Sequence, residues 1–156
     1  MKTLLKVSGL VATPKEFAFE DLARLPGQLP DVSKRVPGRE GGAVRLEALL
    51  EAVSPLAEAR YITLSTEDGA FSASVSLQAI QAQGLVLYRL GESALPTAKG
   101  GPLRFLIADV EACGTGDVDK CANVKFLSHI HLSRSPGKDL RPANLKAHED
   151  LHANET

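Results

Sequence analysis

Two cysteines, Cys113 and Cys121, are the residues of this chain with the most versatile chemistry. They lie in a loop that also contains glycines and acidic residues, between apolar segments at residues 103–108 and 124–132. Three interpretations stay open: two buried thiols, a redox-active disulfide, or a metal site that uses one sulfur. The spacing is not that of the Cys-x-x-Cys pairs of zinc ribbons, and no second pair exists. A zinc-ribbon site is therefore not expected.

All four histidines lie from residue 129 onward. His129 and His131 flank Ile130 in the second apolar segment. If Ile130 faces the core of a sheet, both imidazoles project from the opposite face. They are either exposed surface side chains or part of a site for zinc, nickel or copper. In the second case, His148 and His152 would join them if the C-terminal helix folds back on the strand.

Residues 148–152 read H-E-D-L-H and match the H-E-x-x-H pattern of zinc proteases. On a helix, His148 and His152 share one face, and Glu149 is placed to activate a metal-bound water. The segment is very polar, however, and no good third ligand follows it. We therefore expect a solvated surface helix rather than a protease site.

The elements that must position these side chains are mostly short strands. Alternating apolar residues predict strands at 3–11, 59–65, 71–75, 85–90, 103–108 and 124–132, with helices at 19–25 and 47–53. There is no regular alternation of strand and helix. This order predicts an α+β fold with mixed or antiparallel sheets and short helices. Residues 1–132 would form the domain, and residues 133–156 a polar linker and a surface helix.

Composition excludes several classes of function. The 156 residues carry a formal net charge of −1 and no basic stretch, so we expect no nucleic-acid partner. No segment approaches the ~20 apolar residues needed to span a bilayer, and the N-terminal apolar run is too interrupted for a signal peptide. We therefore expect a cytoplasmic protein without a membrane partner. No nucleotide-binding glycine motif is present. The sequence does not indicate a protein partner or an oligomeric state.

Several motifs occur in an order that resembles a known family. They read GLVATPKEF, AVRLEALLE, YITLSTEDG, GGPLRFLI and VKFLSHIHL, between about residues 3 and 132. The chain is similar to the molybdopterin-binding domain of the sulfite-oxidase-like oxidoreductases, in a short form. The resemblance implies molybdopterin as the cofactor and a molybdopterin-dependent oxidoreductase activity.

The resemblance also implies roles for individual residues. It places Arg104 and Lys125 near the phosphate or pterin of the cofactor, with Gly101 beside them. A surface role for these two charges is the competing interpretation. The family's metal-ligand cysteine would lie within residues 29–43, where this chain has none. Ser33 is the nearest analogue there, and a hydroxyl is a poorer ligand for a soft metal than a thiolate. Cys121 could supply a thiolate from another position.

Two functional classes follow from the absence of the family's metal-ligand cysteine. The first is a molybdopterin-dependent oxidoreductase domain or subunit. The second is a non-catalytic binding or scaffold domain of the same fold, which has lost the metal ligand and could hold a transition metal through its histidines. Zinc or another transition metal is the alternative cofactor in that case.

Overall fold

The computed structural model describes residues 3–36, 38–67, 71–108 and 124–137. Cys113, Cys121, His148 and His152 lie outside the described residues, as does the predicted C-terminal helix. The predictions made for these residues therefore stay predictions.

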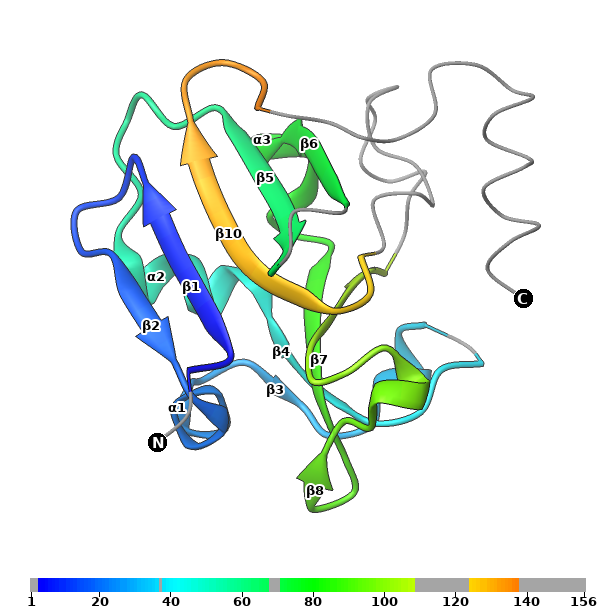
Figure 1. The fold of residues 1–156 in the computed structure, drawn as a ribbon. Helices are drawn as coiled ribbons and strands as arrows, with labels where there is room; N and C mark the ends of the chain where they lie inside the picture. Colours follow the sequence, from blue (N-terminus) through cyan, green and yellow to red (C-terminus); the bar gives the residue numbers. More distant parts are fainter. Residues whose placement is uncertain (1–2, 37, 68–70, 109–123, 138–156) are drawn as a thin grey trace, which may run out of the picture.

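The first sheet has five strands, and its middle strand is the last one along the chain (Figure 1). The pairing of β1 with β10 is parallel, whereas the other neighbours are antiparallel. The order is β2 (Lys15–Phe17), β1 (Leu5–Gly9), β10 (Leu127–Ser133), β5 (Tyr61–Thr66) and β6 (Ser72–Ser76).

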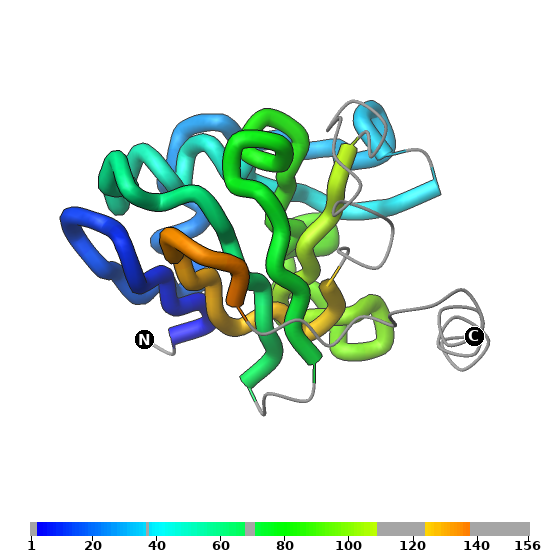
Figure 2. Tube along the Cα trace, turned by 90° about the horizontal axis from the view of Figure 1, so that it is seen from above, coloured from blue at the N-terminus to red at the C-terminus, as the bar shows by residue number. Residues whose placement is uncertain are grey.

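The second sheet is antiparallel and is built around one long strand, β7 (Gly84–Leu90). On one side β7 pairs with β4 (Gly42–Arg45), which pairs in turn with β3 (Gln28–Leu29). On the other side β7 pairs with β8 (Ser93–Ala94) and with β9 (Arg104–Ile107). In Figure 2, β4 and β10 lie in different layers of the domain.

In the described part of the chain, three short α-helices and two 3₁₀ turns connect the strands. The longest, α2 (Leu46–Val53), packs against β4 and β7. Its buried residues include Leu46, Leu49, Leu50 and Val53, the spacing of one helix face. The others are α1 (Phe19–Arg24), α3 (Leu77–Ile80), η1 (Val32–Lys34) and η2 (Thr97–Lys99).

Both faces of the second sheet are buried, which explains why its central strand is apolar at nearly every position. Val86 and Tyr88 point into the main core, which the two sheets share. Leu85 and Leu87 point the other way, into a smaller cluster. That second cluster consists of Val32, Ala43, Leu85, Leu87, Leu95 and Leu106.

A short crossing segment, residues 124–127, joins the two sheets. Its backbone follows the residues that lead into β9: the Phe126 amide donates to the Gly100 carbonyl at 2.9 Å, and the Leu127 amide to the Leu103 carbonyl at 2.9 Å. The Phe105 amide in turn donates to the Val124 carbonyl at 2.8 Å.

The crossing segment shows that one predicted strand was given the wrong start. The predicted strand at 124–132 begins only at Leu127, because Phe126 adopts a left-handed backbone conformation with φ +56°. Phe126 is also 46% exposed, although it follows the apolar Val124 at the two-residue spacing of one strand face.

The predicted fold class is confirmed: the described residues form mixed and antiparallel sheets with a few short helices. The helices predicted at 19–25 and 47–53 and the longer predicted strands are present with shifted ends. The short strands β2, β3 and β8 were not predicted. No helix among the described residues has the length and apolar character needed to cross a bilayer.

Candidate functional site

Arg104 and Lys125 come together over Gly100. Gly100 ends η2 with φ +93°, a conformation that favours glycine. A Cβ built on Gly100 would lie 3.2 Å from Cδ of Arg104 and 3.2 Å from Cγ of Lys125. The two side chains therefore cover the same glycine, although Arg104 begins β9 and Lys125 lies in the crossing segment. We call Gly100, Arg104 and Lys125 the cationic patch.

The charge of the cationic patch suits an anion. Both side chains are half-buried. Within the described residues, no carboxylate lies within ion-pair distance of the Lys125 ammonium. The ion pair that these residues do form joins Lys6 and Glu16 on the first sheet. The aliphatic stems of an arginine and a lysine thus meet at one glycine, and guanidinium and ammonium groups are both common phosphate ligands.

Gly101 has a packing role in the structure. A Cβ at this position would lie 1.9 Å from the Leu95 carbonyl oxygen and 2.9 Å from that of Pro96. The Gly101 amide donates to the Pro96 carbonyl at 3.0 Å. Close approach of two backbone segments thus accounts for a glycine here without a ligand, and the predicted contact with a cofactor stays a prediction.

Ser33 belongs to a local cap. Asp31 precedes η1, and its Oδ1 accepts hydrogen bonds from both the amide, at 3.0 Å, and the hydroxyl of Ser33. These bonds, the hydroxyl one first, hold the pKa of Asp31 below its ordinary value. The only hydroxyl side chain within residues 29–43 thus donates a hydrogen bond to the neighbouring Asp31 carboxylate.

This cap gives a first test. Ser33→Ala removes the stronger hydrogen bond to Asp31, so we expect the pKa of the Asp31 carboxyl to rise towards its ordinary value of 3.8. The measurement is a carboxyl-detected NMR titration of wild type and variant. Ser33→Thr, which keeps a hydroxyl, is the control and should keep the low pKa. An unchanged pKa in Ser33→Ala would mean that the hydroxyl is free to bind elsewhere.

The loop that contains Ser33 lies over the sheet face from which Arg104 projects. Val32 is fully buried in the second cluster with Leu106, which is two residues from Arg104 on β9. The Val32 amide donates to the Gly41 carbonyl at 2.9 Å, which fixes the loop beside β4. The described part of the chain therefore brings the Ser33 loop and Arg104 to one face, with β7 between their strands.

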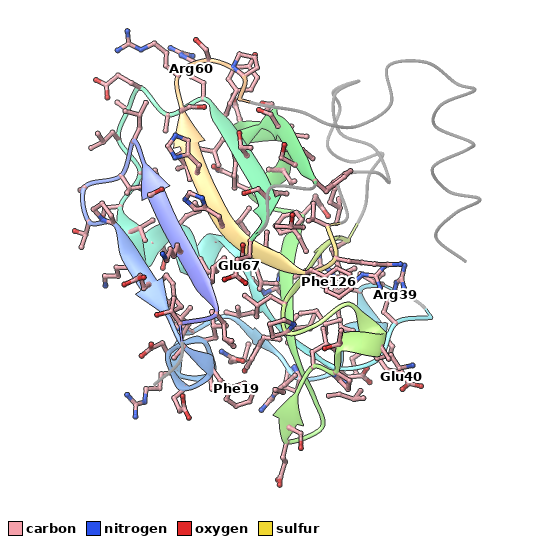
Figure 3. The ribbon with its side chains drawn as sticks, viewed as in Figure 1. Phe19, Arg39, Glu40, Arg60, Glu67 and Phe126 are labelled. Carbon is pink, nitrogen blue, oxygen red and sulfur yellow. The ribbon has the colours of Figure 1, made fainter. Side chains whose placement is uncertain are left out.

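Phe126 is the residue that the sequence analysis missed. It is exposed, directly follows Lys125, and has a left-handed backbone that is uncommon for a bulky side chain. Figure 3 shows it at the lower end of β10, whereas Arg60 lies at the upper end. A strained, exposed aromatic residue beside a cationic patch is a candidate contact for a ligand.

The histidine pair lies on the outward face of the first sheet. As predicted from the alternation, Ile130 and Leu132 are buried and the two imidazoles share the other face. His129 Nε2 lies 2.7 Å from Ser8 Oγ, and His131 Nδ1 lies 3.3 Å from the same oxygen. Burial lowers the pKa of His129, and the charges of His131 and Lys6 lower it further. No three His, Cys, Asp or Glu side chains converge within the described residues.

Comparison with known proteins defines the family. A family model described as the oxidoreductase molybdopterin binding domain matches residues 41–139, well over half of the chain. The chain therefore belongs to the molybdopterin-binding oxidoreductase family, and the resemblance found in the sequence is confirmed. No curated protein matches the sequence.

A solved structure supports the same fold. The crystal structure of the sulfane dehydrogenase SoxCD from Paracoccus pantotrophus matches with a TM-score of 0.60 and 18% sequence identity. The match covers 85% of this chain but only 38% of the SoxCD chain. The chain thus has the fold of part of a much longer protein.

Proposed function

We propose that this domain binds a molybdopterin-type cofactor and that the cationic patch holds the cofactor's phosphate. The observation that carries the proposal is the convergence of Arg104 and Lys125 over Gly100. The family match covers all three residues. Phe126 offers an exposed aromatic face beside the patch, suited to a flat heterocycle. When bound, such a cofactor supplies oxygen-atom or electron transfer at its metal.

The residues at the candidate site suit the anionic part of the cofactor better than its metal. Residues 29–43 contain no cysteine, and Ser33 there is hydrogen-bonded to an ionised Asp31. A carboxylate that already accepts the hydroxyl proton and has a low pKa is a weak base, so it does not favour an alkoxide ligand. We therefore propose binding of the pterin and its phosphate, and derive no redox step.

The test is recovery of the cofactor with the purified protein. The full chain is produced in a host that makes molybdopterin, and the oxidised pterin is quantified by fluorescence, with molybdenum measured by elemental analysis. We expect a near-stoichiometric pterin signal in the wild type. In Arg104→Ala/Lys125→Ala the signal should fall by about tenfold or more, since each charge-assisted hydrogen bond to phosphate contributes roughly 1.5–3 kcal/mol.

Arg60→Gln is the matched control. It also removes an exposed cation, but at the far end of β10, where the Arg60 amide donates to the Ser133 carbonyl (Figure 3). This variant should keep the pterin. The proposal fails if the wild type carries no pterin under these conditions, or if Arg60→Gln lowers the signal as much as the double variant.

A non-catalytic binding or scaffold domain is the second candidate, and the capped Ser33 favours it. Molybdenum content separates the two functions: pterin without molybdenum favours the non-catalytic domain, whereas pterin with stoichiometric molybdenum favours an oxidoreductase. In the second case, a thiolate from outside residues 29–43 would be required, and Cys121→Ser should lose the molybdenum. Retention of molybdenum in that variant would exclude Cys121 as the ligand.

A further inference from the structure

The first sheet carries a second group of potential ligands, on its outward face and separate from the cationic patch. Its members are His129 and His131 on β10 and Ser8 on β1. We propose that His129 and His131, with Ser8 between them, form a surface site for one divalent transition-metal ion of the class that imidazole binds, such as Ni²⁺, Zn²⁺ or Cu²⁺.

The backbone holds this group in place. β10 lies between β1 and β5, so hydrogen bonds on both sides fix the strand that carries the two histidines (Figure 1). Residues two apart on a strand project from the same face. The parallel register places Ser8 directly opposite His131 and Lys6 opposite His129. Two imidazoles from β10 and a hydroxyl from β1, which is remote in sequence, therefore meet at the middle of the sheet.

The nitrogen atoms are directed at a common point. Ser8 Oγ lies 2.7 Å from His129 Nε2 and 3.3 Å from His131 Nδ1, and the ring centroids are 5.9 Å apart. The serine oxygen thus marks a position that both rings face. An ion bound to both nitrogen atoms at about 2.0–2.1 Å requires the two side chains to rotate towards each other. The hydroxyl then serves as a third donor.

The surrounding charges permit a cation without attracting it strongly. Lys6, opposite His129, would repel a metal ion, but its ammonium lies 3.8 Å from the Glu16 carboxylate. On β5, the residues paired with the histidines, Ser65 and Thr63, are uncharged. Two imidazoles and one hydroxyl leave positions for water, so the site is open and its affinity is expected to be micromolar.

The experiment isolates the pair within the full chain. The background variant Cys113→Ser/Cys121→Ser/His148→Gln/His152→Gln removes the other sulfur and imidazole ligands, so that His129 and His131 are the only histidines left. Titration with NiCl₂ is followed by calorimetry, and titration with ZnCl₂ by the imidazole ¹⁵N signals in NMR. We expect one ion per chain and shifts of both His129 and His131.

Single substitutions decide the outcome. Added to this background, His129→Gln or His131→Gln should weaken nickel binding by about a hundredfold, because a ligand is lost outright. Lys6→Gln should strengthen it by about threefold at low salt, since one repulsive charge is removed. The proposal is overturned if the background variant binds no ion while its thermal unfolding is unchanged. It is also overturned if either histidine can be replaced without loss of binding.

Discussion

Alanine at position 101 is expected to destabilise the domain by about 3 kcal/mol or more, an unusually large effect for the addition of one methyl group. The methyl would lie 1.9 Å from the Leu95 carbonyl oxygen, and the atoms nearest to it, the carbonyl groups of Leu95 and Pro96, all belong to the backbone. No side-chain rotation can relieve such a contact. The segment before β9 would have to move away from the chain that follows β8, and the hydrogen bond from the Gly101 amide to the Pro96 carbonyl would be lost.

The measurement is the free energy of unfolding from urea titration of wild type and Gly101→Ala. Gly91→Ala is the matched control, because Gly91 has φ +64° and no atom within 4 Å of an added Cβ. Gly91→Ala should lower the free energy of unfolding only by the cost of a left-handed backbone conformation, about 1–2 kcal/mol. Normal stability of Gly101→Ala together with lost pterin would instead assign Gly101 to the cofactor.

Phe105→Ala is the second substitution with a large expected effect, about 3–5 kcal/mol of lost stability. Phe105 is fully buried on β9, in the main core between the sheets, and its amide holds the crossing segment through the Val124 carbonyl. Truncation leaves a cavity beside the strand that carries Arg104. We expect a lower midpoint of urea unfolding with little change in slope.

Gly84 provides the partner for a double-mutant cycle. A Cβ on Gly84 would lie 2.7 Å from Cζ of Phe105 and 2.9 Å from Cδ2 of Leu46. Gly84→Ala alone therefore overpacks the core, whereas in the Phe105→Ala background the new methyl enters the space left by the ring. The double variant should be more stable than the sum of the single effects predicts, by about 1 kcal/mol. Strict additivity would show that the two residues are not in contact in solution.

Much of the fold could be predicted because buried positions form a regular pattern of apolar residues in the sequence. The two-residue alternation of Ile62 and Leu64 identified β5, and the continuous apolar run of residues 85–88 identified β7, which is buried on both faces. The shared face of His129 and His131 followed from the same period. Very short strands such as β3 carry no such pattern, so the sequence does not predict them.

Three features of the sites were beyond sequence reasoning. The sequence VKFL continues an apolar pattern, and nothing in it signals that Phe126 takes a left-handed conformation and leaves the core. The contact of Ser8 with the histidines depends on a parallel pairing between strands remote in sequence, which local patterns do not specify. The approach of Arg104 to Lys125 over Gly100 likewise required the crossing between the sheets.

The position of β10 has a consequence for the order in which the chain folds during synthesis. Ser8 and His129 are neighbours in the sheet but 121 residues apart in sequence. At about 5–20 residues per second, the ribosome needs on the order of ten seconds to make the strand that β1 must pair with. Until then β1–β2 and β5–β6 are two separate hairpins with unpaired edges. The first sheet is therefore completed late. Until β10 has been synthesised, the unpaired edges of the two hairpins need protection from pairing with other chains.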